Sequence, residues 1–439
     1  MTYENIKTGI LIILIALSGI LTWSVWTFQP KYETMGNERT VNEVAIGEKK
    51  EVKQIIKPHQ VVFHQGNRQV GIIDSKEMDE FISLISQWKY YDVKKFSDES
   101  AAWKKEVTNG IFTEIIFPEV VPIDAYKRVL NFQDDNLPKI EFDRIIIDSS
   151  TSGKQEGEIY FYSTKTEQTF KSYVSLTAIN EFSDEYEQKT AEYASFNGYD
   201  LPSGKNVYLP SEETEMKSYT YYRNPIESEE LKNALFRDPS FVQRSFVPDG
   251  EEYADEASKM TVDNNTNIIS YISPFRESET GVGPENLVQK SIDFVNVHSG
   301  WTDHFRYAYK DDRNQKVVFR MYTEQGYPIF NQIGMSEIIQ EWGHSEIKRY
   351  NRPSFYLEIP LNSGMRTEVF PSGQEVIDFL LEKEGMNHEL IENVSLGYYM
   401  LSNPNDSSLI YLEPGWFYQY DNVWFELKLE EEVPNNGLG

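Results

Sequence analysis

The chain has 439 residues, of which 39% are hydrophobic and 14% aromatic, and this composition excludes a disordered stalk. Its formal net charge of -28 argues against binding to nucleic acid and against direct adhesion to anionic lipids or wall polymers. The absence of cysteine excludes disulfides and thiolate metal sites.

An apolar stretch opens the chain: residues 8–28, TGILIILIALSGILTWSVWTF, carry no charge. As a helix this stretch would be roughly 32 Å long, which matches a bilayer core. Trp23 and Trp26 lie at its far end, where amphipathic rings favour the membrane interface. A cleaved signal peptide is the alternative, but its apolar region would be shorter and a small-x-small cleavage site would follow. We therefore predict an uncleaved transmembrane anchor at 8–28.

The anchor also predicts an orientation and a contact. A short tail before a first hydrophobic segment usually stays inside, so residues 1–7 are predicted to be cytoplasmic and the bulk of the chain extracytoplasmic, on a single-pass protein of the cell membrane. Gly9, Ala16 and Gly19 fall on one face of the helix. Small residues let membrane helices approach closely, so this strip is a candidate contact with a transmembrane partner. The alternative is that small residues are simply common in such helices.

The segment after the anchor, 29–57, is polar and charged and is predicted to be a linker. Order is expected from residue 58, in an N-terminal extracytoplasmic domain over 58–200. Strands at 61–63 and 70–73 flank a turn at Gly66, which is a hairpin signal. A helix is expected after Asp74, with apolar residues spaced by three and four at Met78, Phe81, Ile82, Ile85 and Trp88. Further strands are predicted at 111–117, 142–147 and 159–162, and a further helix at 179–193.

A Gly, Pro, Asn and Ser cluster at 196–204 marks a domain boundary, with a central domain at 201–350 and a C-terminal domain at 351–433. These two domains are predicted to be related by duplication. Residues 207–209 resemble 355–357, and the helix at Leu231, Ala234 and Leu235 resembles the helix at Ile377, Leu380 and Leu381.

Helices and hairpins alternate along the rest of the chain. The helix at Ile377 carries a capping box that begins at Ser372. Strands are expected at 268–272 and 409–412, and the last hairpin turns at Asp421-Asn422. The predicted class is therefore α+β, with three mixed extracytoplasmic domains built on antiparallel sheets.

Candidate metal sites are weak. His298, Asp303 and His304 are the best set, but no H-E-x-x-H spacing supports them. The segment from Asp263 begins like a calcium loop, but Ile268 stands at the position that requires glycine. The sequence therefore predicts no metal and no cofactor.

Candidate catalytic residues are also weak. Ser86 and Lys89 match the serine-x-x-lysine of wall enzymes, but no exported Lys-Thr-Gly partner exists. The aromatic residues at 416–425 could stack on wall sugars, although on paired strands half of them would fill a core. No catalytic residue is predicted.

Three stretches together resemble the YycH family: MTYENIKTGILIILIALSGILTWSVWTFQPKYE at the start, Val-Val-Phe-His at 61–64, and the predicted hairpin FRMYTEQGYPIF at 319–330. The resemblance runs over nearly the whole chain. It implies a membrane-anchored accessory protein of the YycG/WalK sensor histidine kinase in low-GC Gram-positive bacteria, with three extracytoplasmic domains. It also implies a complex with a YycI-like membrane protein, in which membrane helices contact one another and adjust kinase activity.

The resulting hypothesis is a non-enzymatic regulator of a sensor histidine kinase that controls cell-wall metabolism. Two alternatives remain open at this point. An extracytoplasmic wall-glycan binding module predicts exposed aromatic planes between Trp416 and Trp424. A cell-wall hydrolase or transferase predicts a pocket with converging carboxylates, or Ser86 beside Lys89.

Overall fold

A computed structural model describes residues 18, 46–96, 110–150, 153–273, 287–343, 346–361, 365–403 and 406–429. The chain divides into a unit at 1–41 and a unit at 42–439, and the second unit holds the fold. None of the helices in the described ranges has both the length and the apolar character needed to cross a membrane. The predicted anchor, Ser18 excepted, and its strip Gly9, Ala16 and Gly19 lie outside those ranges.

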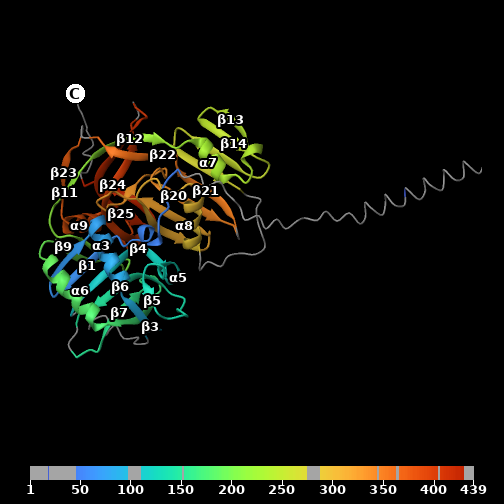
Figure 1. Cartoon of the computed structure of the whole chain (residues 1–439). Helices are drawn as coiled ribbons and strands as arrows, with labels where there is room; N and C mark the ends of the chain where they lie inside the picture. Colours follow the sequence, from blue (N-terminus) through green and yellow to red (C-terminus); the bar gives the residue numbers. More distant parts are fainter. Residues whose placement is uncertain are drawn as a thin grey trace, which may run out of the picture. The chain divides into compact units, whose positions relative to one another are not determined.

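A ten-stranded sheet forms the first half of the unit (Figure 1). Its strands, in spatial order, are β10 (Asn206–Pro210), β9 (Ala194–Asp200), β2 (Arg68–Ile72), β1 (Gln60–Gln65), β4 (Ile111–Pro122), β6 (Glu141–Asp148), β7 (Glu156–Tyr162), β8 (Thr169–Ser175), β3 (Lys89–Lys95) and β5 (Asn131–Phe132). All pairings are antiparallel except the short pair of β3 with β5. The predicted hairpin at Gly66 and the three predicted strands are confirmed.

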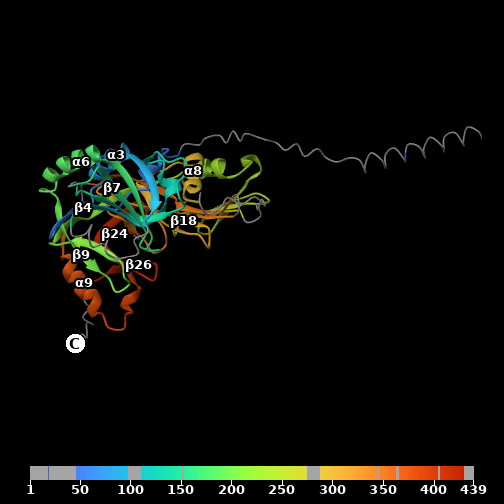
Figure 2. The same cartoon turned by 90° about the horizontal axis from the view of Figure 1, so that it is seen from below.

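Two helices, α3 (Ser75–Ser86) and α6 (Leu176–Lys189), cover one face of this sheet, as Figure 2 shows. Phe63 of β1 packs between them, with its ring 6.2 Å from Phe81 of α3 and 5.2 Å from Tyr186 of α6. The predicted apolar face of α3 is confirmed by the burial of Met78, Phe81, Ile82 and Ile85, but the helix ends at Ser86, so Trp88 is buried beyond its end. The helix α6 starts and ends earlier than the predicted 179–193, so Tyr193 lies beyond its end.

An eight-stranded antiparallel sheet follows. In spatial order its strands are β13 (Gln243–Val247), β14 (Gly250–Ala254), β15 (Lys259–Asp263), β16 (Ile268–Ile272), β21 (Ile347–Pro353), β20 (Glu337–Trp342), β18 (Lys316–Met321) and β17 (Phe305–Asp311). The helices α7 (Ser228–Leu235) and α8 (Leu287–His298) pack on it. For example, Trp342 of β20 donates its indole N–H to Ser291 Oγ of α8 at 2.8 Å.

A six-stranded sheet completes the core. Its strands in order are β19 (Ile329–Phe330), β24 (Ile391–Ser402), β25 (Leu409–Tyr420), β12 (Tyr219–Pro225) and β22 (Phe355–Pro360), with β26 (Val423–Leu427) also paired to β25. The remaining described elements are α2 (Val52–Ile55), α5 (Ile123–Tyr126), α9 (Gly373–Glu382), the pair β11 (Thr214–Lys217) and β23 (Thr367–Phe370), and 3-10 turns at Pro239–Phe241 and His388–Leu390.

Local signals in this part of the chain are also confirmed. The capping box of Ser372 and Glu375 opens α9. Asp421 and Asn422 both have positive φ, at 49° and 63°, which is the two-residue turn that matches the twist of a hairpin. One detail is wrong: Leu381 of α9 is 40% exposed, so it is not part of the buried helix face.

The chain passes repeatedly between the last two sheets. It enters the six-stranded sheet at β12, builds most of the eight-stranded sheet, returns at β19, and leaves again for β20 and β21 before β22. The predicted division at 350/351 falls inside the strand β21, and the division at 200/201 falls inside the β9–β10 hairpin. The three domains and the duplication therefore stay predictions, whereas the α+β class with largely antiparallel sheets is confirmed.

The segment 319–330 differs from the predicted hairpin. Its two arms meet only at a single bridge between Tyr322 and Pro328. The second arm, β19, pairs in parallel with β24 instead. The turn at Gly326 is confirmed, with φ at +96°, but its role is to lead the chain from one sheet into the other.

The cap of α3 gives a first prediction. Asp74 Oδ1 accepts hydrogen bonds from the backbone amides of Lys76 at 2.9 Å and Glu77 at 3.1 Å. Replacing Asp74 by Ala leaves these amides without that acceptor and should lower the free energy of unfolding by about 1 kcal/mol. Urea unfolding of the whole chain would measure the change. Lys76→Ala is the control, because it keeps the cap; equal losses in both variants would contradict this account.

Candidate functional site at the seam between the sheets

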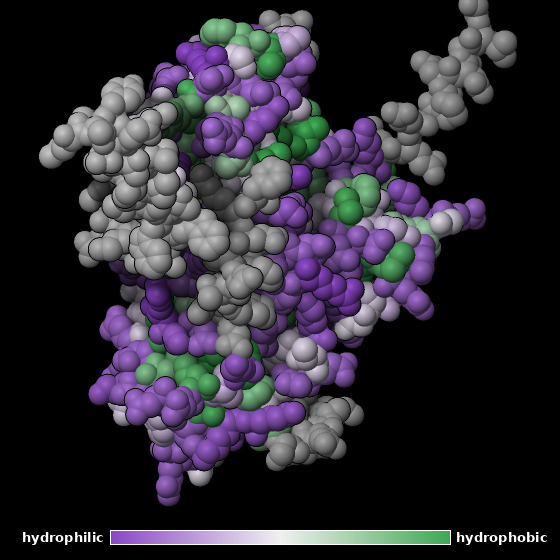
Figure 3. Space-filling model, turned by 90° about the vertical axis from the view of Figure 1, so that its right-hand side faces the viewer, coloured by the Kyte–Doolittle hydropathy of each residue, from purple (hydrophilic) through white to green (hydrophobic). Residues whose placement is uncertain are grey.

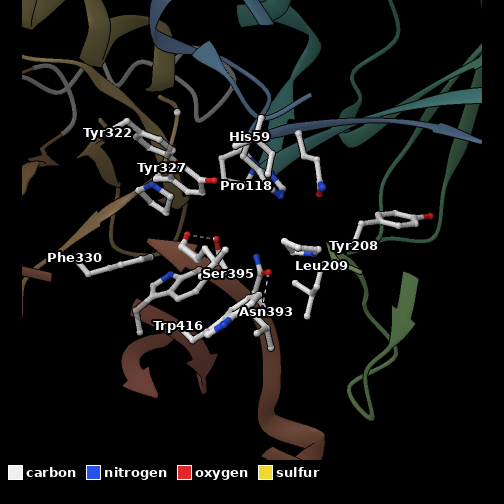
Figure 4. Close-up of a pocket in the computed structure, with 18 of the residues that line it drawn as sticks. His59, Pro118, Tyr208, Leu209, Tyr322, Tyr327, Phe330, Asn393, Ser395 and Trp416 are labelled. Carbon is white, nitrogen blue, oxygen red and sulfur yellow. Dashed lines mark hydrogen bonds between the residues drawn. The ribbon is translucent and has the colours of Figure 1, made fainter. Parts of the chain in front are cut away.

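Two adjoining hollows lie between the sheets, and we call them together the seam cavity. All three sheets contribute to the first, and the ten-stranded and six-stranded sheets line the second. The first has a volume of about 70 Å³ and the second about 280 Å³. They share His59, Gln60, Pro118, Tyr208, Asn393 and Val394. Figure 4 shows side chains entering the first hollow from three directions: His59 and Pro118 from the ten-stranded sheet, Tyr322 and Tyr327 from the β18–β19 segment, and Ser395 and Trp416 from the six-stranded sheet.

The first hollow is too small for a drug-sized ligand, which needs roughly 300 Å³ or more. Its lining combines aromatic rings, such as Tyr327 and Trp416, with aliphatic side chains and with polar groups that include Arg320. A space of about 70 Å³ suits ordered water or one small chemical group. The second hollow is more charged, with Glu119, Arg144 and Lys205 among its lining residues.

A bulge in β4 brings the ten-stranded sheet to the seam. The pairing of β4 with β6 shifts its register between Ile116 and Val121. Pro118 lies in this interval, where its missing N–H costs no ladder hydrogen bond. Bulges redirect side chains next to functional sites, and here the bulge places Pro118 and Glu119 in the lining. Burial raises the pKa of the Glu119 carboxyl.

Polar atoms without partners converge on the cavity. His59 donates its backbone N–H to the carbonyl of Ile116 at 2.9 Å. Its ring Nδ1, and Nε2 of the neighbouring Gln60, have no hydrogen-bond partner among the described residues. Burial, together with the charges of Arg144 and Arg306, lowers the pKa of His59 to about 3. The ring is therefore neutral at ordinary pH and offers hydrogen bonding without charge.

An arginine clamp joins the eight-stranded and six-stranded sheets beside the cavity. Arg320 of β18 donates from Nη2 to Glu337 Oε1 at 2.7 Å and from Nε to the same oxygen at 3.1 Å. Its guanidinium lies 4.9 Å from the ring centre of Phe330 and 5.8 Å from that of Trp424. These stacking distances are typical of cation–π contacts, so one side chain ties β18 and β20 to β19 and β26.

A buried polar network fixes the opposite wall. Tyr208 donates its hydroxyl to Glu114 Oε2 at 2.8 Å, and Arg144 Nε lies 3.1 Å from Glu114 Oε1. Nε2 of His64 lies 3.4 Å from Glu114 Oε2. Burial raises the pKa of Glu114, but His64, Arg144 and Tyr208 outweigh that effect and hold the pKa below its usual value. The network holds the Tyr208 ring in place at the cavity.

The structure does not bring the predicted metal candidates together as a site. His298 stacks on Phe294 with ring centres 4.0 Å apart, and its Nδ1 lies 2.9 Å from the Phe294 carbonyl. Asp303 and His304 line a different hollow. Across the described ranges, no group of three or more His, Cys, Asp or Glu side chains could hold a metal ion. The calcium-like segment is the turn between β15 and β16, where Asp263 accepts hydrogen bonds from the amides of Asn265 and Thr266.

The other two sequence candidates have structural roles. Ser86 donates its hydroxyl to the carbonyl of Ser83 at 2.8 Å, at the end of α3. Trp416 and Phe417 are each 1% exposed, so they belong to the core. Tyr418 and Phe425 are cross-strand partners in the last hairpin, with ring centres 5.7 Å apart. The stretch 416–425 thus fills a core and pairs across strands, as predicted, but its faces do not alternate as expected, because the consecutive residues Trp416, Phe417 and Tyr418 are all buried.

Sequence reasoning missed the seam cavity. It assigned no functional role to His59, Gln60, Tyr208 or Arg320. The one local signal was the proline inside the apolar run of β4, which points to a bulge. Nothing local indicates that a bulge in one sheet faces β24 of another.

Two family models match the chain: the YycH protein N-terminal domain at residues 4–191 and the YycH protein C-terminal domain at residues 204–432. The chain belongs to the YycH family. The two-component system WalR/WalK regulatory protein YycH of Bacillus subtilis (strain 168) is 24% identical over 434 residues, which cover 95% of this chain and 94% of that protein. The predicted family resemblance is confirmed.

The crystal structure of YycH from Bacillus subtilis has the same fold. The two structures agree with a TM-score of 0.74 at 19% sequence identity, over 88% of this chain and 99% of that chain. The arrangement of sheets described above is therefore shared with a YycH protein of known structure. The seam cavity is lined by residues from both family matches: His59 and Pro118 lie in the N-terminal match, and Trp416 lies in the C-terminal match.

The depressed pKa of His59 predicts a pH dependence. Between pH 6.5 and about 3 the unfolded chain binds a proton at this position that the folded chain does not. The free energy of unfolding should therefore fall as the pH is lowered through this interval. Urea unfolding at several pH values should show a flatter dependence for His59→Gln than for the native chain. His388→Gln, outside the seam, should keep the native slope; an unchanged slope in His59→Gln would refute the assignment.

Proposed function

We propose that this chain is a non-enzymatic accessory regulator of a WalK-like sensor histidine kinase that controls cell-wall metabolism. The observation that carries the proposal is the family match over most of the chain. The relative from Bacillus subtilis, which is similar over nearly its whole length, is named a WalR/WalK regulatory protein.

The proposal includes the membrane anchor at 8–28, with the amino terminus inside and the folded unit outside the cell. The uncharged run and its terminal tryptophans support it. The N-terminal family model begins at residue 4 and so includes this run. We further propose that Gly9, Ala16 and Gly19 form the face that contacts the membrane helices of the kinase and of a YycI-like partner.

Such an anchor would act by coupling two equilibria. If it packs better against one signalling state of the kinase, binding shifts the population by that difference in free energy and by no more. A few kcal/mol suffices to change the balance of two states substantially. Contacts along one face of a membrane helix lie within this range.

A free sheet edge supports contact between the folded unit and a YycI-like partner. All five residues of β13, the terminal strand of the eight-stranded sheet, are exposed, and β13 pairs only with β14 among the described strands. Phe246 in this strand is 76% exposed and nearby Phe241 is 75% exposed. Figure 3 shows hydrophobic side chains in small groups on an otherwise hydrophilic face of the molecule. An unpaired edge with exposed rings is suited to strand addition by a protein partner.

The anchor hypothesis predicts a loss of regulation. Changing Gly9, Ala16 and Gly19 together to Leu should abolish the effect of the chain on a kinase-dependent reporter, because the added bulk prevents close helix approach. Ser18→Leu is the control, since an ideal helix places position 18 on the opposite face. Membrane levels of each variant must match.

A shortened chain of residues 1–35 separates the anchor from the folded unit. If this short chain restores normal reporter output, the membrane helix is the effector. Normal output from the triple-leucine chain would reject the small-residue face. Unchanged output when the whole chain is deleted, under growth and under wall stress, would reject the regulatory function itself.

The edge hypothesis predicts a second result. Phe246→Glu should reduce co-purification with a YycI-like protein from membranes by about tenfold or more, because it places a charge at a strand-addition surface. Ile111→Glu is the matched control; Ile111 is also exposed, at 58%, but lies on β4. Equal co-purification of both variants would rule out this edge as the contact.

A further inference from the structure

Another hollow, separate from the two that form the seam cavity, lies where the segment 46–57 runs over α3 and the start of β17. Its volume is about 710 Å³, which is the size of a ligand pocket. Its lining includes three cationic side chains, Lys50, Lys57 and Arg306. We call it the basic hollow. The lining also holds three acidic side chains, Glu48, Asp79 and Asp303.

Arg306 is the central group of the basic hollow. It is only 3% exposed, and Nη2 donates to Ser75 Oγ at 2.7 Å. Its guanidinium stacks on Tyr322 at 4.6 Å. Nη1 has no hydrogen-bond partner, and no carboxylate forms an ion pair with Arg306 among the described residues. A buried guanidinium without an anion is costly, and such an orphaned donor calls for an explanation.

Lys50 provides a second source of donors. Its ammonium group donates one hydrogen bond, to the carbonyl oxygen of Asp303 at 2.7 Å. An ammonium carries three N–H groups, so two remain for other acceptors. Burial lowers the pKa of Lys50, and burial likewise lowers the pKa of Arg306, which indicates that neighbouring carboxylates do not fully offset their desolvation.

The acidic groups at the basic hollow are mostly engaged. Asp79 is ion-paired with Lys57. The carboxylate of Asp303 accepts hydrogen bonds from the Leu357 amide at 3.0 Å and from Thr302 Oγ1 at 2.8 Å. Glu48 also lines the hollow but its side chain is exposed to solvent. Arg306 and Lys50 therefore keep free donors that no acid in the described lining satisfies.

We propose that the basic hollow binds a compact oxyanion, a phosphate or carboxylate group, between Nη1 of Arg306 and Nζ of Lys50. Both donors are charged, and charge-assisted hydrogen bonds to an oxyanion are the strong ones. Arginine supplies the planar fork that suits phosphate and carboxylate, and lysine adds a point charge. The inference does not depend on the regulatory role.

The site would tie the segment 46–57 to the folded unit. Backbone hydrogen bonds already hold this segment to the chain that follows α8, from Gly47 to Ser299 at 2.9 Å and from Trp301 to Glu48 at 2.9 Å. Lys50 belongs to this segment and Arg306 to β17. An oxyanion bound to both would add a bridge between two parts of the unit that lie far apart in sequence.

The test uses the full chain in detergent micelles and titrates inorganic phosphate by calorimetry at constant ionic strength, with chloride as the balancing anion. Phosphate should bind and should raise the melting temperature as its concentration rises. Lys50→Gln should weaken binding by about tenfold or more, because one charge-assisted hydrogen bond is lost. Lys348→Gln removes an exposed charge elsewhere and should leave binding unchanged.

Arg306→Lys should also weaken phosphate binding, since it removes the fork but keeps the charge. If this buried substitution prevents folding, Lys50→Gln alone still decides the question. Parallel titrations with acetate, glycerol phosphate and vesicles of phosphatidylglycerol identify the source of the oxyanion, and a Lys50-dependent response to any of them supports the site. No response to any of the four, or equal binding by Lys50→Gln and the native chain, would overturn the proposal.

Discussion

The contact of Arg320 with Phe330 and Trp424 is the point on which the arrangement of the C-terminal half depends. The chain leaves the eight-stranded sheet immediately after β18 and enters the six-stranded sheet at β19, with only residues 322–328 between them. Residues 322–328 form no strand ladder, because the two sides of the turn share only the bridge between Tyr322 and Pro328. Arg320 bonds to Glu337 on its own sheet and stacks on rings of the other, so it links the two sheets at the crossing.

The same crossing creates the seam cavity. The ten-stranded sheet contributes a bulged strand, and a bulge cannot be packed as closely as a regular ladder. The polar atoms of His59 and Gln60 that have no partner among the described residues belong to side chains that line this cavity.

The basic hollow occupies a corresponding position at another junction. There the chain that follows the predicted anchor runs over α3 and β17. The two sites differ in the donors that lack partners among the described residues: at the seam these include the neutral side chains of His59 and Gln60, and at the basic hollow the cationic side chain of Arg306. Both join segments that are distant in sequence, which suits a protein whose proposed task is to transmit a state between an anchor and a partner.

Much of the local structure could be predicted. The alternation at 61–73, the three- and four-residue spacing in α3 and the paired positive-φ residues at Asp421-Asn422 are encoded within a few residues, because periodicity and turn conformation are local properties. The order of three stretches was enough to identify the family.

The tertiary structure alone decided how these elements combine. The sequence suggested a hairpin at 319–330, but β19 finds its partner in β24, about 70 residues away, and strand pairing over such distances leaves no local pattern. The same holds for His59, whose neighbours at the cavity come from β4, β10 and β24. It holds also for Arg306, because only the folded structure shows that its Nη1 has no hydrogen-bond partner among the described residues. The spacing of apolar residues and the conformation of turns are determined by consecutive residues. Burial and the hydrogen bonding of polar atoms depend instead on which distant segments of the chain come into contact.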